Sequence, residues 1–126
     1  MPFTVVSIED EEEITELLSV VLDHPELKVV ASNTAFGGLE LVKKLQPQLV
    51  IMDILLPDMD GWSIYDSIRA DPVLRNTPIM ILSGLRREFQ SRRVFRTGPL
   101  DLYLTKPFDT LQLRKRIELM IGHQIW

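Results

Sequence analysis

The chain has 126 residues and a net charge of −4 at pH 7, a size that suits one domain of roughly 100–150 residues, here spanning 1–126. It contains no cysteine, so disulfide frameworks, thiolate zinc sites and cysteine nucleophiles are excluded. The acidic balance argues against direct nucleic-acid binding, because phosphate contacts need a clustered Lys/Arg surface. Neither a cationic leader nor an apolar segment of membrane length is present, so we expect a cytoplasmic protein that does not bind membranes.

The first half of the chain predicts three β-strands separated by two helices. Residues 3–8 are apolar and β-branched, as in a buried strand, and the acids that follow them suit the start of a helix. That helix should stop near residues 24–25, and its apolar stripe is Ile14, Leu17, Leu18, Val21 and Leu22. Strands are then expected at 27–31 and 49–52, on either side of a helix at 35–45.

The second half of the chain repeats this alternation. A turn at 57–61 precedes a helix at 62–70, a strand at 79–82, a helix at 86–96, a strand at 100–104 and a helix at 111–121. Parallel strands need crossover connections, which the helices supply. The pattern therefore predicts an α/β fold, a doubly wound five-stranded parallel sheet with helices on both faces. Ligands of such sheets bind beyond the carboxyl ends of the strands.

Chemically active side chains stand at the ends of four predicted strands. Glu9 and Asp10 follow the first strand, Asp53 ends the third, and Ser83 and Lys106 follow the fourth and fifth. Three carboxylates close together repel one another unless a cation lies among them, and oxygen ligands without His or Cys favour Mg²⁺. Once Mg²⁺ and the Lys106 ammonium neutralise the phosphate oxygens, Asp53 can attack phosphorus and form an aspartyl-phosphate.

Four fragments in this order resemble the response-regulator receiver domain of two-component signalling: EDEEEI at 9–14, DILLPDMDG at 53–61, SG at 83–84 and YLTKPF at 103–108. Each fragment alone is weakly specific, but their combined order and spacing, over nearly the whole chain, is highly specific. The resemblance implies the flavodoxin-like strand order 2-1-3-4-5. It also implies phosphoryl transfer from a histidine kinase, a phosphotransfer protein or a small phosphodonor. Such a domain is a regulatory phosphoacceptor that assists its own phosphorylation and dephosphorylation, and not an enzyme in the usual sense.

The resemblance further implies roles in the metal site for four residues. Asp53 would be the phosphoacceptor and, with Asp10, a direct Mg²⁺ ligand. Glu9 would reach the ion through water. Leu55 would contribute only its backbone carbonyl.

The implied signal is a change of surface shape after phosphorylation. Ser83 would hydrogen-bond the phosphoryl group and Lys106 would pair with one of its oxygens. Tyr103 would be the aromatic switch residue, and the face between Arg86 and Tyr103 would change its affinity for a downstream protein target. A phosphorylation-linked homodimer is a further expected partner. Relative to the family pattern, one residue is inserted between Gly98 and Tyr103.

The same residues are compatible with two further functions and with purely structural roles. A phosphate-ester hydrolase would also use an Asp nucleophile and Mg²⁺, although the DxD pattern typical of such enzymes after the first strand is absent. A receiver that no longer accepts phosphate could serve only for binding, against which the intact acids, Ser83 and Lys106 argue. Glu9 and Asp10 could instead complement a helix dipole as first-turn acids, Tyr103 could simply pack, and the arginines between 86 and 96 could be a solvated face. The sequence does not decide whether Trp126 packs, nor whether the chain acts alone or within a longer regulator.

Overall fold

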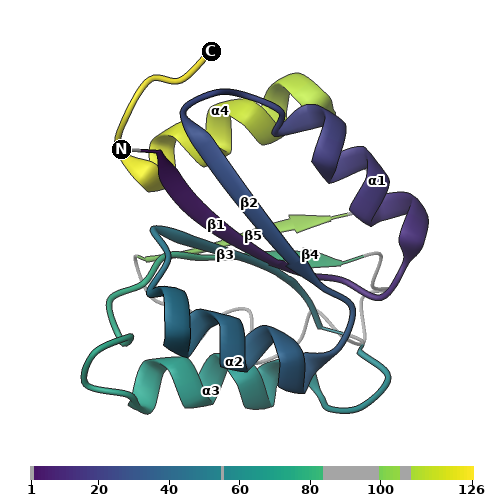
Figure 1. Cartoon of the computed structure of the whole chain (residues 1–126), viewed down its shortest axis with the longest axis vertical. Coiled ribbons are helices and arrows are strands. Elements are labelled where there is room, and N and C mark those ends of the chain that lie inside the picture. The colour runs from purple at the N-terminus through teal and green to yellow at the C-terminus, as the bar shows by residue number, and fades with distance from the viewer. Residues whose placement is uncertain (1, 55, 84–99, 106–108) are drawn as a thin grey trace.

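The structure is a computed structural model of the chain and describes residues 2–54, 56–83, 100–105 and 109–126. Within these residues the elements run β1 (Phe3–Ile8), α1 (Glu12–Val21), β2 (Leu27–Ser32), α2 (Ala35–Leu45), β3 (Leu49–Asp53), α3 (Gly61–Ala70), β4 (Ile79–Ser83), β5 (Asp101–Thr105) and α4 (Thr110–Ile121) (Figure 1). The predicted elements in the described residues are confirmed, with bounds shifted by up to three residues. The helix predicted at 86–96 lies outside the described residues.

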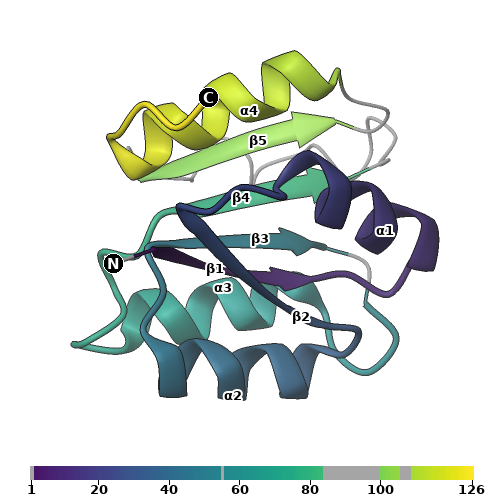
Figure 2. The ribbon, with the colours of Figure 1, turned by 45° about the horizontal axis from the view of Figure 1, so that its top comes forward.

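The five strands form one parallel sheet in the order β2-β1-β3-β4-β5, as the sequence predicted. Figure 2 shows α1 and α4 on one face of this sheet and α2 and α3 on the other. Because all the strands are parallel, their carboxyl ends meet at one edge. That edge is where a ligand of a doubly wound sheet binds.

Each face of the sheet has its own apolar core. Val5, Ile51, Leu113 and Ile117 belong to the core beneath α1 and α4, and Val6, Met52, Ile64 and Ile68 are among the residues of the opposite core. The central strand β3 is buried on both faces along its whole length, which explains its unbroken apolar sequence up to Asp53. The carboxyl end of this strand is consequently held rigidly from both sides.

The apolar stripe predicted for the first helix is only partly correct. Leu18, Val21 and Leu22 are buried, but Leu17 is 38% exposed. In a helix of 3.6 residues per turn, Leu17 lies at the border of the stripe that the other three residues form. The stripe that packs on the sheet is therefore narrower than the sequence pattern.

The chain end packs against the domain, so Trp126 does not extend freely into solvent. One oxygen of Glu118, Oε2, accepts the backbone N–H groups of Ile125 at 2.7 Å and Trp126 at 3.0 Å. Ile125 is buried, and the Arg114 guanidinium lies 5.1 Å from the centre of the Trp126 ring. The last residues thus run back beside α4 (Figure 2).

Among the described helices, none combines the length and apolar character needed to cross a membrane.

Candidate functional site

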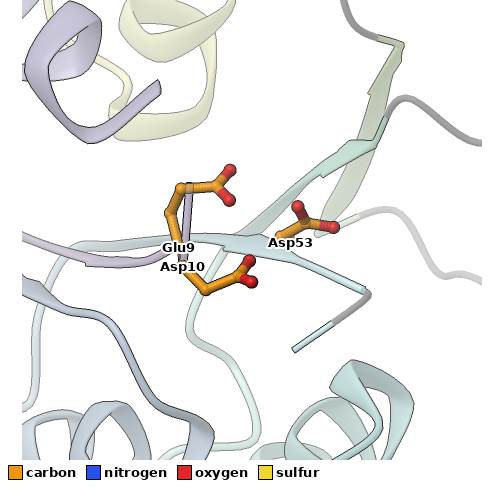
Figure 3. A group of neighbouring side chains, drawn as sticks. All are labelled: Glu9, Asp10 and Asp53. Atoms are coloured by element: carbon orange, nitrogen blue, oxygen red, sulfur yellow. The ribbon is translucent and has the colours of Figure 1, made fainter. Parts of the chain in front are cut away.

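The structure brings Glu9, Asp10 and Asp53 together beyond the carboxyl ends of β1 and β3 (Figure 3). One carboxylate oxygen from each residue lies within 4.8 Å of the other two. The cause is the register of the sheet, in which Ile8 of β1 is paired with Met52 of β3. The residues that follow these two positions are therefore adjacent at the sheet edge.

The three acids differ in exposure. Glu9 is 2% exposed and Asp53 is 5% exposed, whereas Asp10 is exposed to solvent. The position of Glu9 is fixed by its backbone N–H, which donates to the carbonyl of Ser32 at 3.0 Å, and by its Oε2, which accepts the N–H of Glu11 at 3.1 Å. Clustered carboxylates in such a setting favour a cation among them, and an all-oxygen donor set fits Mg²⁺.

The first-turn position predicted for Glu9 and Asp10 is wrong, because both residues precede the first turn of α1. The helix α1 begins at Glu12, its N-cap is Glu11, and the acids in its first turn are Glu12 and Glu13. The two residues instead belong to the connection between β1 and α1. This leaves their carboxylates directed to the sheet edge, where Asp53 lies.

The other predicted site residues are placed only in part. Asp53 is paired with Leu82, so the end of β4 lies beside the phosphoacceptor predicted from the sequence. Ser83 is the last residue of β4 and its backbone is paired with Thr105, while Tyr103 lies within β5. Leu55, Lys106 and the arginines between 86 and 96 lie outside the described residues. The roles of all these residues stay predictions.

A glycine closes the loop that follows Asp53; the sequence placed Gly61 at the end of a turn but did not predict its close approach to the end of β3. The backbone N–H of Gly61 donates to the carbonyl of Ile54 at 2.8 Å. A Cβ at this position would lie 2.6 Å from both the Asp53 carbonyl oxygen and the Ile54 Cα. Backbone atoms cannot yield easily, so only glycine allows α3 to start this close to the end of β3.

Asp58, in the same loop, is another residue whose role the sequence did not predict. Its Oδ1 accepts the backbone N–H of Ala35 at 2.8 Å and its Oδ2 accepts that of Phe36 at 3.0 Å. These two bonds hold the pKa of Asp58 below its ordinary value of 3.8. A turn acid beside Pro57 was visible in the sequence, but its partners, 22 and 23 residues away, were not.

Comparison with known proteins identifies the fold and the family that the sequence predicted. The family model of the response regulator receiver domain matches residues 5–118 of the chain. The DNA-binding dual master transcriptional regulator RpaA of Synechocystis is 29% identical over 117 residues, which are 93% of this chain and 48% of RpaA. The cell cycle transcriptional regulator CtrA of Caulobacter vibrioides is 31% identical over 117 residues, 93% of this chain and 49% of CtrA. The chain therefore spans about half the length of these curated relatives.

A solved structure shows the same arrangement of strands and helices. The receiver domain of the sensor histidine kinase PA1611 from Pseudomonas aeruginosa, which has a magnesium ion coordinated in its active site cleft, superposes with a TM-score of 0.82. Its sequence identity is 24%, and the alignment covers 97% of this chain and 99% of that domain. Since the family match runs through all five strands and the strand order agrees with it, the chain belongs to the response regulator receiver domains, the regulatory domains of two-component signalling.

Proposed function

We propose that this chain is a phosphoacceptor switch that, with Mg²⁺ bound, takes a phosphoryl group onto Asp53. The donor would be the phosphohistidine of a histidine kinase or of a phosphotransfer protein, or a small phosphodonor. The observation that carries the proposal is the approach of the Glu9, Asp10 and Asp53 carboxylates to within 4.8 Å of one another. The magnesium ion in the PA1611 receiver domain supports the same choice of metal.

In this proposal Asp10 and Asp53 bind Mg²⁺ directly, with the backbone carbonyl of Leu55 as a further ligand. Mg²⁺ commonly keeps several of its waters in protein sites, so buried Glu9 can act through one of them. When bound, the ion supplies charge neutralisation for the phosphoryl oxygens. The residues of the chain then need only to position the donor and hold the product.

The proposed transfer forms a bond between an Asp53 carboxylate oxygen and phosphorus as the bond from phosphorus to the donor breaks. Ser83 donates its hydroxyl hydrogen to one phosphoryl oxygen and the Lys106 ammonium pairs with another. The position of Ser83 at the end of β4, directly after Leu82, which pairs with Asp53 on β3, supports its role. Water later attacks the aspartyl-phosphate and releases phosphate. Each chain accepts one group at a time, so we describe it as a regulatory domain and not as an enzyme.

The output we propose is protein binding. Phosphorylation at Asp53 stabilises one of two conformations, and the face between Arg86 and Tyr103 then changes its affinity for a downstream protein target or for a second copy of the chain. A net charge of −4 favours protein over nucleic-acid partners. The same proposal assigns the chain to the cytoplasm, where acetyl phosphate and kinase phosphohistidine are formed.

The deciding experiment is incubation with acetyl phosphate and Mg²⁺, followed by intact mass measurement and assay of released phosphate. The wild type should gain one phosphoryl group, Asp53→Asn should gain none, and Asp23→Asn, which changes an exposed acid outside the site, should behave as the wild type. Omitting Mg²⁺ should abolish the gain. Release of phosphate over many turnovers without labelling would indicate a hydrolase, and neither labelling nor release would indicate a binding module.

A further inference from the structure

The N-terminus of α2 is completed by a residue from another part of the chain. A helix begins with backbone N–H groups that have no partner within the helix. In α2 the Thr34 hydroxyl oxygen accepts the N–H of Gly37 at 3.1 Å. The N–H groups of Ala35 and Phe36 both donate to the carboxylate of Asp58, one to each oxygen. Asp58 therefore binds two adjacent amides at the positive end of the helix dipole.

Asp58 lies in the loop that leaves the site at Asp53. The far end of that loop is fixed by the Gly61 bond to Ile54 and by Asp60, whose carboxylate accepts the N–H of Trp62 at 3.0 Å. Asp60 thus ties the loop to α3, the helix that directly follows it. Asp58 ties the same loop to α2, the helix that connects β2 to β3 and so precedes the loop in the chain.

Helix α2 in turn packs tightly on β1 just before the acid pair. A Cβ at Gly38 would lie 2.5 Å from Ile8 Cδ1, and Ile8 directly precedes Glu9 and Asp10. The start of α2 therefore touches β1, the strand that precedes Glu9 and Asp10, and through Asp58 it binds the loop that follows Asp53. The register of β1 and β3 brings Asp53 beside the acid pair, and these two contacts hold α2 against β1 and against the loop after Asp53.

We propose that Asp58 is a positioning residue for the metal site, a role that rests on the proposed function. By holding the loop after Asp53 against the start of α2, it keeps the three carboxylates at the spacing that Mg²⁺ requires. Residues that orient metal ligands without touching the metal commonly affect affinity about 10- to 100-fold. Loss of Asp58 should consequently weaken Mg²⁺ binding more than it slows the chemistry at saturating Mg²⁺.

The test is calorimetric titration of the unphosphorylated protein with Mg²⁺, together with acetyl phosphate labelling at several Mg²⁺ concentrations. Asp58→Ala should raise the dissociation constant of Mg²⁺ about tenfold and leave the labelling rate at saturating Mg²⁺ near that of the wild type. Asp58→Asn should give an intermediate constant, because its amide NH₂ cannot accept the second N–H. Circular dichroism verifies that each variant is folded.

Asp60→Ala is the matched control, since it removes a cap from the same loop without breaking the bridge to α2. Thr34→Ala removes a cap from α2 itself. Both should lower the melting temperature as much as Asp58→Ala does and leave Mg²⁺ affinity unchanged. Equal Mg²⁺ affinity in Asp58→Ala and the wild type, or equal weakening in the controls, would overturn the positioning role.

The same measurements separate this role from the proposed function. If the wild type binds Mg²⁺ but is never labelled, the proposed phosphorylation fails while the affinity comparison still decides the role of Asp58. If the wild type binds no Mg²⁺, both fail.

Discussion

The Tyr65 hydroxyl donates a hydrogen bond of 2.6 Å to Oδ2 of Asp101 and so joins the middle of α3 to the first residue of β5. Arg69, one turn further along α3, donates to Oδ1 of the same carboxylate, and its guanidinium lies 5.3 Å from the centre of the Tyr65 ring. The Asp101 side chain is 1% exposed. Two side chains of α3 thus bind both oxygens of the buried Asp101 carboxylate. These bonds connect α3 to β5, the strand that contains Tyr103.

Asp101→Ala should destabilise the domain by about 3 kcal/mol, because the Arg69 guanidinium loses its buried carboxylate partner and keeps the bonds to the carbonyls of Arg75 and Thr77. The value lies at the lower end of the usual range since the Arg69 side chain is 20% exposed and can turn toward water. Tyr65→Phe removes only one hydrogen bond to the carboxylate and should cost about 1.5 kcal/mol. Urea denaturation measures both. Equal losses in the two variants would show that the ion pair contributes nothing beyond the tyrosine bond.

The contacts of Asp101 with Tyr65 and Arg69 are of a kind that the sequence could not predict. Local periodicity identifies a strand or helix and its buried face, and the pairing of parallel strand ends is enough to place Glu9 and Asp10 beside Asp53. The partners of Asp101 are 32 and 36 residues away, and nothing local to a polar residue specifies so distant a contact. Asp58 and its α2 amides were missed for the same reason, and Leu17 was misassigned because it lies at the border of the buried stripe, where the sequence pattern alone does not fix burial.

Gly61→Ala should damage the metal site as well as the fold. Its methyl group would lie 2.6 Å from the Asp53 carbonyl oxygen, so the end of β3 must shift at a cost of about 1–3 kcal/mol. Because Asp53 belongs to the acid cluster, the Mg²⁺ dissociation constant measured by calorimetry should rise.

The matched control is Gly122→Ala at the end of α4. Gly122 has a φ of 79° and no atoms near its Cβ position, so alanine costs about 1–2 kcal/mol through backbone strain alone. Its Mg²⁺ affinity should equal that of the wild type. A similar loss of affinity in both glycine variants would mean that general destabilisation, and not the contact with Asp53, weakens the site.

Ser7→Ala should stabilise the domain. The Ser7 hydroxyl is buried in β1, and the part of the chain that the structure describes offers it no hydrogen-bond partner. It lines a cavity of about 270 Å³ beneath α1, with Thr15 and Leu18 among its neighbours. Burying an unbonded hydroxyl costs about 1–3 kcal/mol, so its removal should raise the free energy of unfolding by about 1 kcal/mol.

Ser19→Ala serves as the comparison, because the exposed Ser19 hydroxyl donates to the Glu16 carbonyl at 2.6 Å and its loss should change little. A lower urea midpoint for Ser7→Ala would contradict the prediction. It would indicate that an ordered water in the cavity bonds to the Ser7 hydroxyl and is lost with it.

Acid should release the chain end from α4. The N–H groups of Ile125 and then Trp126 hold the pKa of Glu118 below its ordinary value of 4.5. A carboxyl whose pKa is lower in the folded state stabilises that state above its unfolded pKa, and the contribution disappears as the pH falls through the lowered value. The tail should therefore detach at a pH below 4.5, as the Glu118 carboxylate becomes protonated, and Trp126 emission should then shift to longer wavelength. The measurement uses a Trp62→Phe background, so that Trp126 is the only tryptophan, and far-UV circular dichroism shows that the domain itself stays folded.

Glu118→Gln in the same background keeps the size of the side chain but cannot titrate, so this acid shift should vanish. If the glutamine variant keeps the same low-pH transition, the tail is held by the packing of Ile125 and Trp126 and not by the Glu118 carboxylate.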